Sequence, residues 1–288
     1  MMRSSQPAGA TIPHLAYKND AFLDSSEARP IRILGEYLEP LGHLRREHVH
    51  DTVVFFGSAR IREQGPLARY YTDAVALAKR LTSWSMHLKS KRSRFVVCSG
   101  GGPGIMEAAN RGAREAGGKT IGFNIGLPHE QRPNPFVTPE LNFEFRYFFM
   151  RKFWFAYLAR ALVVFPGGFG TLDELMEFLT LSQTGKLTRR IPILLYGKSF
   201  WDEIVDFEAL ARHGLISVED LQLLAYADTP DEAFAYLEHV LAPRTAEVEA
   251  AETPSIACSC DPHTHGAIAQ AEPMPCCAAA ESGSAKTP

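Results

Sequence analysis

The sequence lacks a run of about 18 apolar residues, the length that a membrane-spanning helix needs. It also lacks an apolar signal core, since residues 1–10 are largely polar. These two absences predict a cytoplasmic protein with no membrane partner. The formal net charge is only −3 over 288 residues, so composition gives no electrostatic reason to expect nucleic acid as a partner.

Cysteine is scarce and unevenly placed, with five residues in the whole chain. Cys98 falls in a predicted core strand. The other four lie near the end of the chain, at Cys258, Cys260, Cys276 and Cys277. Their spacing matches neither a disulfide framework nor a standard zinc pattern, so the sequence predicts no metal site.

Composition divides the chain into three parts. Residues 1–30 mix Ser, Pro, Ala and charged residues without periodicity, and are predicted to be poorly ordered. Residues 31–245 carry the apolar patterns of a single globular domain. Residues 246–288 shift to Ala, Pro, Ser, Glu and Cys, which predicts a disordered tail.

Strand patterns alternate with helical patterns throughout the predicted domain. Strands are predicted at residues 52–56, 95–98, 120–123, 141–145, 162–165, 191–196 and 223–227. Helices are predicted at residues 31–44, 67–84, 105–116, 146–157, 200–212 and 230–241, with one more opening at residue 171. This alternation predicts a Rossmann-like α/β fold, a doubly wound parallel sheet with helices on both faces. Ligands of such sheets bind at the carboxyl ends of the strands.

A glycine-rich turn follows the fifth predicted strand and leads directly into a helix. Its three glycines, Gly167, Gly168 and Gly170, allow positive φ and leave space for a ligand to touch the backbone. Thr171 is predicted to cap the helix, and Glu174 to complete a capping box. The helix N-terminus would then present N–H groups and the positive end of its dipole to a phosphate.

A second glycine turn, from Ser99 to Gly104, follows the strand at 95–98. Two such turns at one sheet edge favour a nucleotide-like phosphate ligand over a purely structural use of glycine. Neither turn is followed by a Walker lysine, so ATP hydrolysis is not predicted. The dinucleotide fingerprint G-x-G-x-x-G is not matched cleanly, which disfavours a nicotinamide-dependent oxidoreductase.

The charged residues near these turns have a chemical and a structural interpretation. A carboxylate beside a phosphate, at Glu174 or Glu177, is costly unless it binds ribose hydroxyls or a developing cation, whereas a capping glutamate needs no chemistry. Arg151 and Lys152 follow a run of aromatic residues in a predicted helix. An arginine there can hold a phosphate or carboxylate with two hydrogen bonds, or the two residues are a solvated surface pair.

Three motifs together resemble the Lonely Guy family, whose members were long labelled lysine decarboxylase-like. Pro166–Glu174, which reads PGGFGTLDE, is similar to the family's PGGxGTxxE signature. Ser99–Asn110 resembles its first glycine loop, and Arg151-Lys152 its Arg-Lys pair. The resemblance covers residues 51–241. It implies a Rossmann-like homodimer that hydrolyses the N-glycosidic bond of AMP or N6-modified adenylates, the cytokinin precursors, without a cofactor.

The resemblance also implies roles for individual residues. Arg151 and Glu174 would be the catalytic pair. The substrate-binding residues would be Gly101, Gly102, Glu107, Arg151, Lys152, Gly167, Gly168, Gly170, Thr171 and Glu177. Decarboxylation would need a cofactor-binding lysine, and no motif marks one. The alternative is a nucleotide or molybdenum-cofactor carrier on the same fold, without turnover. The aromatic segment 143–157 is predicted to form the dimer contact.

Overall fold

The computed structural model describes residues 15–126, 132–187 and 189–243. The chain divides into two units, Met1–Glu249 and Ala250–Pro288. The second unit and the four C-terminal cysteines lie outside the described residues. The tail boundary at residue 246 therefore stays a prediction.

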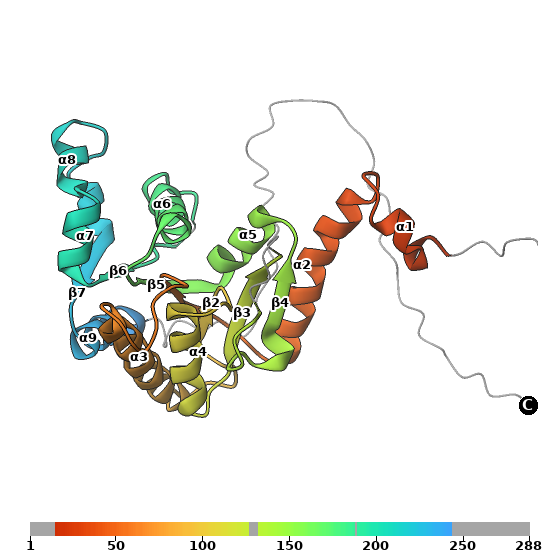
Figure 1. Cartoon of the computed structure of the whole chain (residues 1–288), viewed down its shortest axis with the longest axis horizontal. Helices are drawn as coiled ribbons and strands as arrows, with labels where there is room; N and C mark the ends of the chain where they lie inside the picture. Colours follow the sequence, from red (N-terminus) through yellow and green to blue (C-terminus); the bar gives the residue numbers. More distant parts are fainter. Residues whose placement is uncertain (1–14, 127–131, 188, 244–288) are drawn as a thin grey trace, which may run out of the picture. The chain divides into compact units, whose positions relative to one another are not determined.

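The described residues contain one sheet of seven parallel strands, in the order β4-β3-β2-β1-β5-β6-β7 (Figure 1). The strands are β1 Thr52–Phe56, β2 Val96–Ser99, β3 Thr120–Ile125, β4 Asn142–Phe145, β5 Ala159–Val164, β6 Ile193–Tyr196 and β7 Leu224–Ala227. The chain builds outward from β1 to β4 on one side and continues with β5 on the other side of β1. The strand order therefore reverses between β1 and β5, where Val54 pairs with Leu162. Such a switch point is where ligands bind in this class of sheet.

Helices cover both faces of the sheet (Figure 1). One face packs against α3 Ala68–Met86, α4 Ile105–Glu115 and α9 Pro230–Leu241. The other packs against α2 Arg29–Arg46, α5 Phe148–Leu158, α6 Phe169–Gln183, α7 Lys198–Ile204 and α8 Phe207–Arg212. The remaining short elements are α1 Asp20–Leu23 and the 3-10 turns Ala16–Lys18, Pro139–Leu141 and Glu219–Leu223. The predicted doubly wound fold is confirmed.

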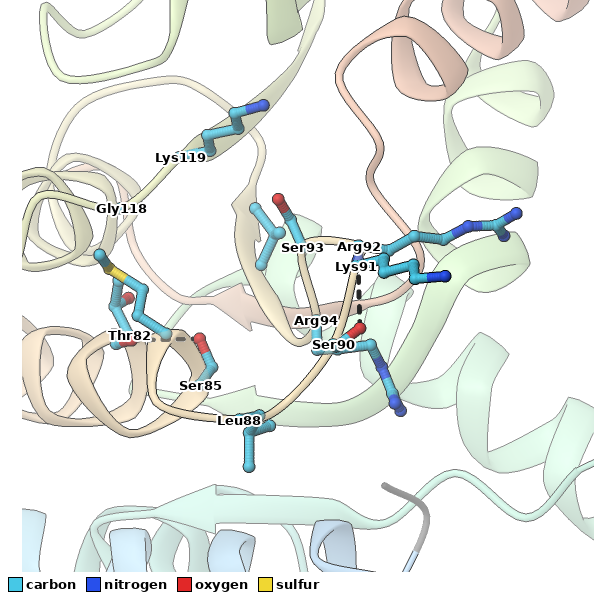
Figure 2. A pocket seen from close by; sticks show the side chains of 12 residues that line it. Thr82, Ser85, Leu88, Ser90, Lys91, Arg92, Ser93, Arg94, Gly118 and Lys119 are labelled. Atoms are coloured by element: carbon cyan, nitrogen blue, oxygen red, sulfur yellow. Dashed lines mark hydrogen bonds between the residues drawn. The ribbon is translucent and has the colours of Figure 1, made fainter. Parts of the chain in front are cut away.

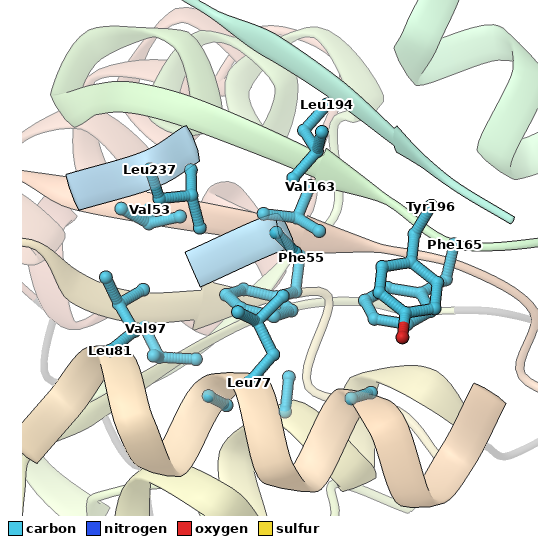
Figure 3. Close-up of a cluster of buried hydrophobic side chains, with 14 of the residues drawn as sticks. Val53, Phe55, Leu77, Leu81, Val97, Val163, Phe165, Leu194, Tyr196 and Leu237 are labelled. Atoms are coloured by element: carbon cyan, nitrogen blue, oxygen red, sulfur yellow. The ribbon is translucent and has the colours of Figure 1, made fainter. Parts of the chain in front are cut away.

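The strands are continuously apolar because each one is buried on both sides. Val53 and Phe55 of β1 belong to the core cluster that packs against α3, in which Leu77 of α3 approaches Phe55 (Figure 3). The intervening Val54 contributes to the core on the opposite face. Since successive side chains of a strand point to opposite faces, a strand without polar positions is the pattern that two helical layers require.

Two parts of the predicted pattern differ from the structure. The helix predicted at 200–212 is two helices, because Val205 is extended and the Asp206 carboxylate accepts the Ala209 N–H at 2.7 Å, capping α8. Residues 15–30, predicted to be poorly ordered, hold α1 and the start of α2. There the Asn19 side chain accepts the Phe22 N–H at 3.3 Å.

None of the helices in residues 15–126, 132–187 and 189–243 is both long and apolar enough to cross a membrane.

Candidate functional site

The glycine turn after β5 leads into α6 two residues earlier than the sequence suggests. Gly168 is the N-cap of α6, and its carbonyl accepts the N–H groups of Thr171 and Leu172, each at 3.0 Å. Thr171 is therefore the third helical residue, and the predicted capping box with Glu174 is wrong. Glycine is an acceptable N-cap but has no side chain to signal the position. Glu174 lies in the second turn of the helix, so capping does not explain it.

The three glycines of this turn serve by leaving space, not by adopting positive φ. None of Gly167, Gly168 and Gly170 has a positive φ, so the turn does not use the conformational freedom that glycine allows. A Cβ on Gly167 would lie 2.1 Å from the hydroxyl of Thr171, whereas a Cβ on Gly168 or Gly170 would meet no atom of the described residues within 4 Å. The first N–H groups of a helix have no acceptor within it. The open space at Gly168 and Gly170 therefore leaves the N-terminus of α6 accessible to an anion.

The first glycine loop, between β2 and α4, does use positive φ, at Gly101 and Gly104, both +72°. Asn134 holds this loop in place. Its side-chain amide donates to the carbonyls of Gly101 and Gly102 at 3.0 Å each, and its backbone N–H donates to Gly101 at 2.8 Å. Sequence reasoning missed Asn134, because it lies some thirty residues downstream. Its only local signal is the pair of prolines that flank it.

Arg151 of α5 lies between the first glycine loop and α6. Its Nε donates to the Phe123 carbonyl at 2.7 Å, which fixes the guanidinium at the carboxyl end of β3. A Cβ on Gly100 would lie 2.4 Å from Arg151 Nη2, so the first loop needs glycine there to let the guanidinium approach. On its other side, Arg151 Nη1 lies 3.8 Å from Glu174 Oε1. The structure thus brings together the two residues that the sequence pairs.

Glu174 is a buried carboxylate whose hydrogen-bonding capacity is only partly used. Its exposed fraction is 5%, and its Oε2 has no hydrogen-bond partner among the residues that the structure describes. Burial raises the pKa of Glu174 to about 7, against the opposing effect of Arg151 and Lys152 and with smaller help from Glu177 and Asp173. Burial likewise lowers the pKa of Arg151. Carboxyl groups with such perturbed pKa values cluster at functional sites.

Three further predicted site residues already have protein partners. Lys152 Nζ lies 2.8 Å from Asp173 Oδ2 and 2.7 Å from Glu177 Oε2, so Lys152 and Glu177 are paired with each other. Glu107 accepts a hydrogen bond from the Tyr71 hydroxyl at 3.0 Å, which directs it toward α3 on the opposite face of the sheet. Direct contact of these residues with a ligand stays a prediction.

A separate pocket lies at the amino ends of β2 and β3, at the opposite end of the strands from the glycine loops (Figure 2). Its lining is rich in cations, but two of them bind carboxylates, in the pairs Lys119–Glu47 at 2.8 Å and Arg94–Asp51 at 2.9 Å. Figure 2 shows Lys91 and Arg92 extending away from Thr82. The cations do not converge on the cavity, so its geometry does not favour an anion site.

The parallel sheet, the two glycine loops and the pairing of Arg151 with the buried Glu174 define a Rossmann-like α/β protein with a candidate site at its switch point. Residues 106–237 match the family described as "Possible lysine decarboxylase". The chain is 31% identical over 199 residues to a cytokinin riboside 5′-monophosphate phosphoribohydrolase of Oryza sativa subsp. japonica, covering 67% of this chain and 75% of that protein. It is 29% identical over 189 residues to one of Arabidopsis thaliana, covering 64% and 80%. The chain belongs to the Lonely Guy family.

Two solved structures resemble the fold at lower similarity. The X-ray structure of TM1055 is 23% identical to this chain, with a TM-score of 0.47. The match covers 66% of this chain and 99% of TM1055. The Moco carrier protein from Chlamydomonas reinhardtii is also 23% identical, covers 67% and 99%, and has a TM-score of 0.45. At these values neither structure carries an argument about function.

Proposed function

We propose that this protein hydrolyses the N-glycosidic bond of nucleoside 5′-monophosphates, AMP or N6-modified adenylates, and releases free base and ribose 5-phosphate. The observation that carries the proposal is the pair of Arg151, whose side chain is 14% exposed, and the buried Glu174, held 3.8 Å apart beside the first glycine loop. Family membership supports it, because relatives in rice and Arabidopsis bear the name of this activity.

The phosphate would bind at the N-terminus of α6. The accessible backbone at Gly168 and Gly170 offers N–H groups and the positive end of the helix dipole, and both favour an anion. Thr171 adds a hydroxyl beside Gly167. Glu174 lies one helical turn after Thr171, and a bound 5′-phosphate would therefore place the ribose, rather than a second phosphate, near the carboxylate.

The reaction breaks the bond between C1′ and the base nitrogen, and the bonding electrons leave with the base. Positive charge then develops on the sugar, as in other glycoside hydrolyses. The carboxylate of Glu174 would stabilise that charge more strongly than it stabilises the neutral ribose, which lowers the barrier. Water adds its oxygen to C1′, and its proton ends on the departing base. Arg151 would orient the nucleotide and hold Glu174 in its ionised form.

The proposal predicts strong discrimination between a nucleotide and its nucleoside. AMP should be hydrolysed roughly 10²–10⁴-fold faster than adenosine in kcat/KM, because binding energy at the phosphate positions the distant glycosidic bond. Chromatographic detection of free adenine and ribose 5-phosphate measures both rates. Equal rates on the two substrates would remove the phosphate assignment. Tight nucleotide binding without base release would favour the carrier alternative.

We further propose that the protein is a homodimer joined through α5. In the segment 143–157, the aromatic side chains of Phe143, Trp154 and Phe155 are buried in the monomer. Fewer aromatic side chains of the segment are therefore available to contact a partner. The exposed aromatic side chains of α5 are Phe148, Phe149, Phe153 and Tyr157. Apolar side chains of α2 are exposed as well, at Ile31, Leu34 and Leu38. Contiguous exposed apolar surface of this kind marks interaction sites.

Light scattering at micromolar concentration should give twice the chain mass of 31.9 kDa. Replacing Phe149 and Phe153 with aspartate should reduce the mass to that of a monomer. A charge buried in an apolar interface costs on the order of 2 kcal/mol or more of binding free energy. Leu215→Asp is the matched control, since Leu215 is an exposed apolar residue outside α2 and α5. A wild-type monomer would refute the assembly.

A further inference from the structure

Lys152 lies between two carboxylates of the neighbouring helix. Its Nζ contacts Asp173 at 2.8 Å and Glu177 at 2.7 Å, and its side chain is only 19% exposed. The two carboxylates are four residues apart, so they lie on one face of α6 and enclose a single ammonium group. Burial alone would lower the pKa of Lys152, but the two neighbouring carboxylates outweigh it and raise the pKa. The contact with Glu177 is an ion pair without hydrogen-bond geometry, because Glu177 Oε2 has no hydrogen-bond partner among the described residues.

The neighbouring Arg151 holds the same helix much more loosely. Its distance to Glu174 is 3.8 Å, beyond the range of a good hydrogen bond, and Glu174 Oε2 has no hydrogen-bond partner in the described part of the chain. The two consecutive residues of α5 thus make two kinds of contact with α6. The short ion pairs of Lys152 hold the helices together, while the longer Arg151–Glu174 separation leaves hydrogen-bonding capacity for a ligand.

We propose that Lys152 is a positioning residue, which binds Asp173 and Glu177 to fix α6 against α5 and so sets the separation between Arg151 and Glu174. The inference rests on the proposed function, because the distance between Arg151 and Glu174 is taken to govern the rate of N-glycosidic hydrolysis. Lys152 and Glu177 then act on the substrate through Arg151 and Glu174, not by touching it.

The same contacts influence the charge of Glu174. The charged groups acting on it are Arg151 and Lys152 from α5, and Asp173 and Glu177 from its own helix. The two cations lower the pKa of Glu174 and the two carboxylates raise it, so loss of the Lys152 charge leaves an unbalanced negative environment. Lys152→Met should therefore make Glu174 harder to ionise.

The test compares Lys152→Met with Lys152→Arg, and uses Lys79→Met as the matched control. Lys79 also links two helices through a glutamate: its Nζ lies 3.4 Å from Glu115 Oε2. This pair is outside the candidate site. Lys152→Met should lower kcat for AMP by roughly 10–100-fold with KM within about threefold, because misplaced groups lose rate more than binding. Lys152→Arg should recover most of the rate, and Lys79→Met should match wild type.

The pH profile and the partner carboxylates separate positioning from contact. In Lys152→Met the acidic limb of kcat/KM should move to higher pH by roughly one pH unit. The double variant Asp173→Asn/Glu177→Gln should reproduce the loss of kcat, because it removes the other half of the contact. If the double variant is fully active while Lys152→Met shows a raised KM, Lys152 touches the substrate and the inference is wrong.

One measurement does not depend on the activity. A carbon-13 NMR titration of the Glu174 carboxyl, assigned with Glu174→Gln, should show a higher midpoint in Lys152→Met than in wild type. An unchanged midpoint overturns the inference even if no 5′-monophosphate is hydrolysed. Absence of base release by wild type, with the midpoint shifted, instead refutes the proposed function and retains the positioning. If Lys152→Met fails to fold, the carboxylate double variant supplies a titration of opposite sign: losing two carboxylates that raise the pKa of Glu174 should lower its midpoint, and an unchanged midpoint again overturns the inference.

Discussion

Glu174→Gln is expected to lower AMP hydrolysis by roughly 10²–10⁴, the range for losing one electrostatic or acid–base group. Glutamine keeps the size of the side chain and removes the charge that would stabilise a ribosyl cation. The wild-type rate should also rise with pH through about 7, since burial raises the pKa of Glu174 to that value and only the ionised form acts. The variant should lose this dependence. Initial rates of adenine release from pH 5 to 9 measure both effects.

The matched control is Glu115→Gln, which removes a glutamate paired with Arg111 at 2.9 Å on the exposed side of α4. It alters an Arg–Glu pair of similar chemistry outside the site, and should retain nearly full activity. Near-wild-type hydrolysis by folded Glu174→Gln would falsify the assignment of Glu174 to the reaction.

The same substitution should raise stability at alkaline pH. The pKa of Glu174 is raised in the folded state from its ordinary value of 4.5 to about 7, so its contribution to stability is present below pH 4.5 and is lost as the pH rises through 7. At pH 8 the wild type therefore carries a cost of about 1–3 kcal/mol that glutamine avoids. Thermal melts should show Glu174→Gln above wild type at pH 8, with a smaller difference at pH 5. A catalytic group that reduces stability is typical of active sites.

The fold was predictable from sequence because its signals are local. Each strand is an apolar run of a few residues, since helices cover both faces of the sheet, and each helix repeats its apolar residues at helical spacing. The break between α7 and α8 was not predictable from periodicity, because the apolar spacing of residues 200–212 continues across Asp206. The second helix begins where the Ala209 N–H donates a hydrogen bond to the carboxylate of Asp206.

The sequence pointed to the two residues that the structure brings together at the candidate site, but not to the contacts around them. The order of the motifs pointed to Arg151 and Glu174, and the structure brings them together. The capping box failed because glycine at Gly168 leaves no side-chain signal for the true helix start. Asn134 was missed because its partners in the first loop are distant in sequence. The partners of Lys152 depend on how α5 packs against α6, which no local pattern encodes.

Arg151→Ala is expected to lower AMP hydrolysis by roughly 10²–10³, because it removes both the orienting donor and the cation that keeps Glu174 ionised. Loss of this charge should raise the pKa of Glu174 further, since Arg151 is the largest influence that lowers it. The acidic limb of the pH profile should therefore move to higher pH. The activity of Arg151→Lys should lie between those of wild type and Arg151→Ala. Lysine keeps the positive charge but lacks the forked guanidinium that reaches both Phe123 and Glu174.

The double variant Arg151→Ala/Glu174→Gln should lose less activity than the two single losses combined, because the two residues act on one transition state. Arg111→Ala is the control, since it removes an arginine paired with Glu115 outside the site. Circular dichroism melts must show that each variant is folded at the assay temperature. Strict additivity of the two losses would mean that the residues act independently. Arg151 and Glu174 would then contribute to the rate separately. The burial that lowers the pKa of Arg151 and raises the pKa of Glu174 would not couple their effects on catalysis.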